Sequence, residues 1–182
     1  DAMKPYFISY SQQEAGFKTV TSETIMYVEM NPLTYNIANK LKKDLVVEGN
    51  NEVILADSAV VLMQKLHQIY SGTVIFESQS SKVLDYSKAI FIKKKFKNQK
   101  IGIFYKFKEE LNALKEIFQD NITTELEEFI NTNKSIALQI VSGREGISLR
   151  QADCLVYYNI DFSATSYWQS RDRMTTKDRE KN

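Results

Sequence analysis

The chain of 182 residues holds one cysteine, Cys154, and one histidine, His67. A single cysteine excludes an internal disulfide framework, and the two residues together are too few for a cysteine or histidine metal cluster. No apolar run approaches the roughly 20 residues that cross a bilayer, and no secretory signal peptide is visible. We therefore expect a cytoplasmic protein with no membrane segment and no metal site of its own.

The signatures of a nucleotide-hydrolysing enzyme are also missing. A P-loop requires Gly-x-x-x-x-Gly-Lys-Ser/Thr, because backbone N–H groups and a lysine must wrap the phosphates. None of the six glycines is followed by lysine, and no aspartate is followed by glutamate, a pair that many ATPases use to hold magnesium. This chain alone is not expected to hydrolyse ATP.

Positive and negative residues are nearly equal in number, which gives a formal net charge of +1. Any affinity for nucleic acid must therefore come from local clusters of positive charge. One cluster runs from Lys82 to Lys108, where nine lysines accompany a single acid, Asp85. This stretch fits either a phosphate-binding surface or a solvated helix face in a protein from an AT-rich genome. We interpret the aromatic residues within it as core, not as base-stacking platforms: Phe91, Phe96, Phe104, Tyr105 and Phe107.

Hydrophobic residues make up 43% of the chain, and its length fits one domain. Asn31 followed by Pro32 predicts the start of a helix, since asparagine caps helices and proline fits the first helical position. Asp57 is expected to cap a second helix, which Ser71–Gly72 ends. The first half should hold helices over about 31–43, 57–71 and 82–95, with a hairpin or edge strand after Thr73.

The second half has a different pattern, in which short apolar runs alternate with helical segments. Runs over 101–105, 135–141 and 153–158 predict strands buried on both faces, and helices are expected over about 108–119, 124–131 and 163–173. Strands separated by helices predict a parallel sheet. The polar stretch Lys93–Lys100 divides the single domain into a mainly helical front part, 1–99, and an α/β part, 100–182.

Two polar segments follow these strands and could carry chemistry. Ser142-Gly-Arg-Glu-Gly146 comes directly after a predicted strand, where glycines would let the backbone approach a phosphate. The alternative is a tight turn without a ligand. Further on, helical spacing puts Gln169 and Arg173 on one face. An arginine there suits a transferring phosphoryl group, and the alternative is a solvated, salt-bridged helix end.

In order and content these segments resemble motifs V and VI of superfamily 2 helicases, closest to the remodeller-like DNA translocases and their phage relatives. The resemblance covers about Asn31 to Arg173. It also includes Ile103-Phe-Tyr-Lys-Phe107, which resembles motif IV, and two shorter signatures, Leu66-His-Gln-Ile69 and Ser81-Lys82. Arg144 stands where the family often has glycine, Ser148 where it has asparagine, and Thr176 where it has a second arginine.

The resemblance implies an α/β, RecA-like (P-loop NTPase-type) parallel sheet with flanking helices, preceded by a helical segment. Such a fold is the C-terminal lobe of an ATP-dependent DNA helicase or translocase, from a bacterial or phage-infected cell. It further implies DNA as partner, ATP and Mg as cofactors, and an N-terminal helicase lobe in the same polypeptide that binds most of the nucleotide. The present chain would then be part of a longer protein.

The resemblance also assigns roles to individual residues. Arg173 is the first candidate for an arginine finger and Arg179 the second, with Gln169 beside them as a catalytic residue. Gly146 and Glu145 would lie near the ATP. The expected DNA-backbone contacts are Ser142, Gly143, Arg144, Lys106 and Lys82.

Two other functions remain open. A non-catalytic nucleic-acid-binding module with a degenerate RecA-like fold would account for the missing P-loop. A small-molecule enzyme on a Rossmann-like sheet is the third possibility, although the sequence holds no complete dinucleotide-binding motif. In every case His67 is expected to be a packed or capping residue, Cys154 a small buried hydrophobe, and Tyr167 with Trp168 a structural plug under the Gln169 segment.

Overall fold

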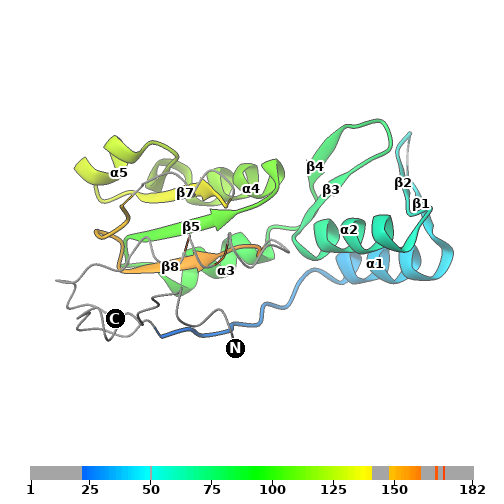
Figure 1. The fold of residues 1–182 in the computed structure, drawn as a ribbon, viewed down its shortest axis with the longest axis horizontal. Helices are drawn as coiled ribbons and strands as arrows, with labels where there is room; N and C mark the ends of the chain where they lie inside the picture. Colours follow the sequence, from blue (N-terminus) through cyan, green and yellow to red (C-terminus); the bar gives the residue numbers. More distant parts are fainter. Residues whose placement is uncertain (1–21, 50, 141–147, 161–166, 168–169, 171–182) are drawn as a thin grey trace, which may run out of the picture.

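The computed structural model describes residues 22–49, 51–140, 148–160, 167 and 170. These residues form an α/β protein with two packed units, which lie end to end along its longest axis (Figure 1). We call residues 31–84 the front unit and residues 85–160 the sheet unit. Leu84 packs in the hydrophobic cluster of the front unit and Tyr86 in that of the sheet unit, although Val83 also packs against the latter. The boundary therefore lies ahead of the polar stretch Lys93–Lys100.

The front unit consists of two helices and two antiparallel hairpins around a small apolar core. Its elements are α1 (Pro32–Asp44), β1 (Val46–Glu48), β2 (Val53–Leu55), α2 (Ala59–Tyr70), β3 (Thr73–Ile75) and β4 (Ser81–Val83). The helix start at Asn31 is confirmed, since its side chain accepts a hydrogen bond from Leu33 N at 2.9 Å. The predicted cap Asp57 is wrong, because Ser58 caps α2 through Val61 N.

The predicted third helix begins later than expected. Ser81–Val83 pairs with Thr73–Ile75 as the second strand of a hairpin, and α3 begins only at Ser87 and ends at Lys95. The hairpin after Thr73 is therefore confirmed, whereas the helical assignment of Lys82 is wrong. Pairing with β3 fixes these residues as a strand despite their helical apolar spacing.

Gly72 connects α2 to this hairpin in a conformation that only glycine adopts readily. Its φ is +81°, and its carbonyl accepts hydrogen bonds from Leu84 N and Asp85 N. A Cβ at this position would lie 2.4 Å from the carbonyl oxygen of Asp85. The close approach leaves no room for a side chain where the front unit meets the sheet unit.

The sheet unit is built on four parallel strands, which confirms the predicted parallel sheet. The strands are β5 (Ile101–Tyr105), β6 (Ile122–Thr123), β7 (Ser135–Gln139) and β8 (Cys154–Tyr157), in the order β6-β7-β5-β8. Besides α3, its helices are α4 (Lys108–Phe118) and α5 (Leu126–Asn131), with a 3-10 turn at Gln119–Asn121. Strand β6 was not predicted, since two residues carry no periodic signal.

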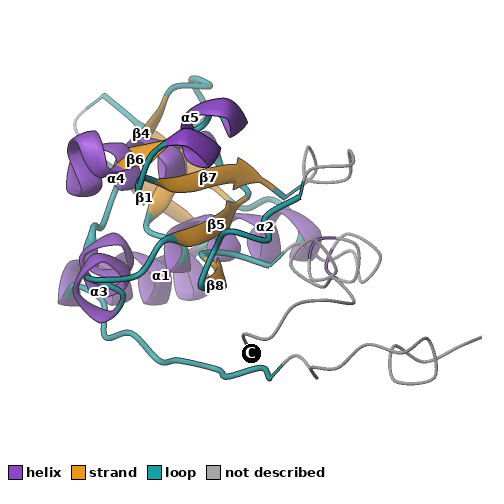
Figure 2. Cartoon of the chain, turned by 90° about the vertical axis from the view of Figure 1, so that its left-hand side faces the viewer, coloured by secondary structure: helices purple, strands orange, loops and turns teal. Residues whose placement is uncertain are grey.

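Alternate residues of each strand enter different hydrophobic clusters. On one face, Ile101, Ile103 and Val156 pack with residues of α3 and α4. On the other, Phe104 and Leu155 pack with Phe129 of α5 and with Leu149 and Ala152. Figure 2, seen from the sheet-unit end, shows helices on both sides of the strands. Burial on both faces explains the nearly continuous apolar runs in the sequence.

The four strands of the sheet unit run in one direction, and the carboxyl end of β5 points toward the front unit (Figure 1). The helix predicted over 163–173 falls outside the described residues except for Tyr167 and Ser170. In the part of the chain that the structure describes, no helix has the length and apolar character to cross a membrane.

Candidate functional site

The carboxyl edge of the sheet is the candidate site, because the chain changes direction there. From β5 the chain passes through α4 to β6 on one side, whereas from β7 it continues to β8 on the other side of β5. Ligands of open α/β sheets bind outside the carboxyl ends of strands at such a switch point. Hydrogen bonds extend past the strands here, from Ile140 N to Tyr105 O at 2.8 Å and from Tyr158 N to Phe104 O at 2.9 Å.

Lys106 is the predicted site residue that the structure places at this edge. It directly follows β5 and is half-buried, with its Nζ 5.5 Å from the centre of the Phe107 ring. Its carbonyl accepts a hydrogen bond from Gln139 Nε2 at 3.3 Å, which links the ends of β5 and β7. In the chain, Ile140 precedes the glycine-containing segment by two residues, and Ile140 N donates a hydrogen bond to Tyr105 O, directly before Lys106.

Lys82 lies on β4 in the front unit, exposed, with its Nζ 5.2 Å from the centre of the Phe76 ring. The neighbouring Ser81 Oγ donates to Glu109 Oε1 at 2.8 Å, so β4 packs against the first turn of α4. Lys82 also borders a hollow of about 360 Å³ between the two hairpins, lined mainly by apolar side chains such as Ile37, Ile54 and Val74. The strand of Lys82 and the helix that follows Lys106 are thus in contact.

The remaining predicted site residues lie outside the described residues. They are Ser142, Gly143, Arg144, Glu145, Gly146, Gln169, Arg173 and Arg179. Their described neighbours in the chain are Ile140 and Ser148 around the glycine segment, and Tyr167 and Ser170 around Gln169.

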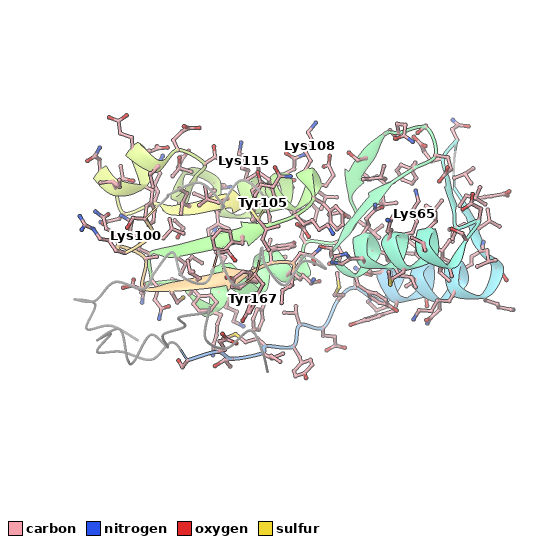
Figure 3. The ribbon with its side chains drawn as sticks, in the orientation of Figure 1. Lys65, Lys100, Tyr105, Lys108, Lys115 and Tyr167 are labelled. Atoms are coloured by element: carbon pink, nitrogen blue, oxygen red, sulfur yellow. The ribbon has the colours of Figure 1, made fainter. Side chains whose placement is uncertain are left out.

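Tyr167 and Ser170 are anchored on β8 through Tyr157. The Tyr157 hydroxyl and Ser170 Oγ form a hydrogen bond of 2.8 Å, and Ser170 is buried. The Tyr157 ring lies 5.2 Å from that of Tyr167 and 5.4 Å from that of Phe104, centre to centre. Tyr167 is half-buried in this stack, and Figure 3 shows it near strand β8 of the sheet.

A buried carboxylate that was not predicted from the sequence accepts a hydrogen bond from the main chain of Lys106. Glu110 is fully buried in the first turn of α4. Its Oε2 accepts from Lys106 N at 2.6 Å and from Phe107 N at 2.9 Å. Its Oε1 accepts from Asn159 Nδ2 at 2.9 Å and from Ser71 Oγ. The carboxylate therefore joins the end of β5, the end of β8 and the end of α2.

His67 continues this network from α2. Its Nε2 pairs with Asn159 Oδ1, and its ring meets that of Phe107 edge-on at 5.4 Å. The prediction that His67 is a packed residue is confirmed. Within the described residues no group of three or more histidine, cysteine or acidic side chains could hold a metal ion.

The charges near this network are only partly exposed to water. Lys88 Nζ lies 3.5 Å from the carbonyl oxygen of Tyr158, and burial lowers the pKa of Lys88 although Glu110 and Asp85 favour its charged form. Burial also raises the pKa of the Tyr158 hydroxyl, and the same two carboxylates add to that shift. The two carboxylates thus partly offset the cost of burying the Lys88 ammonium.

The lysine cluster of the sequence is divided between two edges of the sheet. Lys93–Lys100 precede β5 in the chain, whereas Lys106 and Lys108 follow it. Figure 3 shows Lys100 and Lys108 near opposite ends of the sheet. Of the aromatic residues in this stretch, Phe104 is fully buried, and Phe91, Phe96 and Tyr105 are half-buried against the core, as predicted. Phe107 packs edge-on against His67. The nine lysines do not form one continuous phosphate-binding surface.

Comparison of the sequence with models of protein families and with curated proteins finds no match.

Proposed function

We propose that the chain is the second RecA-like lobe of an ATP-dependent DNA helicase or translocase of superfamily 2, of the remodeller-like type. The observation that carries this proposal is the order of segments at one edge of a parallel sheet. Lys106 follows β5, Ser142–Gly146 follows β7, and the chain from β8 leads through Asn159 to Gln169–Arg173. Parallel strands end at the same edge, so these phosphate-suited segments all start from one side of the sheet.

The proposed division of labour follows from the chemistry of these residues. ATP with Mg²⁺ supplies the free energy and is bound mainly by a first lobe, with Gly146 and Glu145 facing it from this side. The guanidinium of Arg173, or of Arg179, stabilises charge that develops on the transferred phosphoryl group, and Gln169 lies on the same helical face as Arg173. Ser142, Gly143, Arg144, Lys106 and Lys82 hold the DNA backbone, so that closure of the lobes moves one strand.

A test of this proposal uses the polypeptide that joins this lobe to a P-loop lobe. Arg173→Ala should abolish DNA-stimulated ATP hydrolysis and leave DNA affinity unchanged, because the finger acts only on the phosphoryl group. Arg179→Ala is the matched variant. If Arg179→Ala abolishes ATP hydrolysis and Arg173→Ala does not, Arg179 is the finger. Full turnover in both variants would remove the finger from this lobe, and a native gene product without a P-loop lobe would remove the motor altogether.

The missing P-loop favours a second candidate, a nucleic-acid-binding module that lacks catalysis. The two candidates differ in what the 182-residue chain does alone. Salt-dependent binding of single-stranded DNA at micromolar concentration and physiological ionic strength favours the module, because a lone second lobe should bind well only at low salt. Both candidates keep Lys106 as a phosphate contact.

A further inference from the structure

Glu110 differs from an ordinary helix-capping glutamate in the number of segments that it joins. A glutamate at the third position of a helix commonly accepts from the backbone N–H of the capping residue, here Phe107 N. Capping does not account for the other donors, which are Lys106 N, Ser71 Oγ and Asn159 Nδ2. Those come from the end of β5, the end of α2 and the residue after Tyr158.

The direction of each hydrogen bond in this network follows from the chemistry of its members. An ionised carboxylate only accepts, so both Ser71 Oγ and Asn159 Nδ2 must donate to Glu110. Asn159 Nδ2 also lies 2.8 Å from Ser71 Oγ, to which it donates. The amide oxygen of Asn159 is then left to accept from His67 Nε2, which must carry the proton. One arrangement satisfies every member, so the network holds its parts in a single geometry.

The two backbone donors are those that set the direction of the Lys106 side chain. Binding Lys106 N and Phe107 N to one carboxylate oxygen fixes the main chain on both sides of the Lys106 Cα. The other oxygen fixes Asn159, from which the chain continues toward Gln169. One buried carboxylate thereby joins the main chain around Lys106 to Asn159, the second residue after β8.

We propose that Glu110 is a positioning residue for the DNA-binding edge, which holds the Lys106 main chain and the Asn159 segment in register for the phosphate backbone. The inference rests on the DNA contact in the proposed function and needs no part of its ATP chemistry.

The test compares two neighbouring glutamates in the full 182-residue chain. Glu109 is also buried in the first turn of α4, but it accepts from Ser81 Oγ and Asn112 Nδ2, each at 2.8 Å, and not from the end of β5. Glu110→Gln and Glu109→Gln remove the same charge from the same turn. Their affinities for a fluorescent thirty-nucleotide oligothymidine are measured at low salt, alone and with Lys106→Ala, after thermal melts show that each variant is folded.

Loss of a negative charge alone should strengthen DNA binding slightly, and this is expected for Glu109→Gln. Glu110→Gln should instead weaken binding by about tenfold, as when one charge-assisted hydrogen bond is lost. The weakening should disappear in the Lys106→Ala background, because the two residues act through one contact. Equal behaviour of the two glutamine variants, or additive losses with Lys106→Ala, would overturn the proposal.

Amide hydrogen exchange of the same proteins separates this inference from the proposed function. Glu110→Gln should speed exchange at Lys106 and Phe107 by at least about tenfold, and Glu109→Gln should not. If the wild-type chain binds no DNA, the proposed DNA contact fails, and exchange alone decides the positioning role. Unchanged exchange at both amides would then refute it, whereas faster exchange would support it for another ligand at this edge.

Discussion

The two edges of the parallel sheet use lysine in opposite ways. At the amino edge, Lys100 Nζ donates to the Phe129 carbonyl, to Thr132 O at 2.7 Å and to Gln151 Oε1 at 3.0 Å, and Lys93 Nζ donates to Ile117 O at 2.6 Å. At the carboxyl edge, the main chain of Lys106 is fixed by Glu110. One strand of five residues, about 16 Å, separates the two edges. A lysine-rich stretch in a sequence can therefore combine lysines whose ammonium groups bind main-chain carbonyls with one whose main chain is held by a buried carboxylate.

The largest effect on this comparison should come from Glu110→Ala. The change leaves Lys106 N, Phe107 N and Asn159 Nδ2 without their buried acceptor, and the free energy of unfolding should fall by about 3–5 kcal/mol. Urea denaturation followed by circular dichroism measures it. Glu109→Ala serves as the control and should cost less, since its partners are two side chains. A loss below about 1 kcal/mol for Glu110→Ala would show that water replaces the carboxylate.

The next largest effect separates the two edges directly. Lys100→Met removes the ammonium from two main-chain carbonyls, and we expect about 1–2 kcal/mol of lost stability with little change in DNA affinity. Lys106→Met should do the reverse. Its free energy of unfolding should stay within about 0.5 kcal/mol of the wild-type value, and its DNA affinity should depend less steeply on salt concentration. Denaturation and anisotropy titrations on both variants give the answer, and the comparison fails if the two variants behave alike.

A smaller effect on stability, which is seen only at acidic pH, is expected at Asp85, a residue that belongs to neither edge. Burial raises the pKa of its carboxyl, but hydrogen bonds from Ser87, Thr34 and Asn31 outweigh burial, so the pKa lies below its usual range. Because the pKa of Asp85 is lower in the folded than in the unfolded state, its carboxylate stabilises the fold at pH values above the unfolded pKa of about 3.9. This stabilisation is lost as the pH falls through the pKa of the folded state. Asp85→Asn should therefore flatten the fall in melting temperature below about pH 4. An unchanged profile would contradict the assignment.

The smallest effect is expected at the exposed lysines of the amino edge. Lys94 and Lys95 lie in the last turn of α3, where each favours the helix terminus by a few tenths of a kcal/mol. Lys94→Gln with Lys95→Gln should leave stability within about 0.5 kcal/mol and reduce DNA affinity less than Lys106→Met does. A larger loss of affinity than that of Lys106→Met would move the DNA contact to the amino edge.

Sequence patterns predicted the sheet better than the front unit. Runs such as Ile101–Tyr105 are apolar on both faces, which only a buried strand explains, and Asn31 before Pro32 gives a specific start for α1. The hairpin of β1 and β2 was missed because strands of three residues have no periodicity to detect. Ser58 and Asp57 are equally good caps by residue type, so the sequence could not choose between them.

The candidate site was only partly visible in the sequence. Lys106 was predicted from the resemblance of Ile103–Phe107 to motif IV, and the structure places it directly after β5. Glu110 looks like one of many acids in the stretch that begins at Glu109, and its third helical position suggests at most a cap. Its role depends on Asn159, 49 residues later in the chain, and on Ser71, 39 residues earlier. No local pattern reveals contacts over such separations.

The strand order also has a consequence for how the chain folds during synthesis. The front hairpins pair residues such as Val46 with Leu55 and Thr73 with Val83, so they can form soon after they leave the ribosome. Strand β5 emerges next, but Gly102 must wait for Ile136 and Ile101 for Cys154. Such distant partners slow folding, and in the interval an apolar strand lacks its neighbours in the sheet and its cover by Leu149 and Ala152 on one face. Nascent chains that end between β5 and β7 should therefore be the species that chaperones bind and that aggregate most readily.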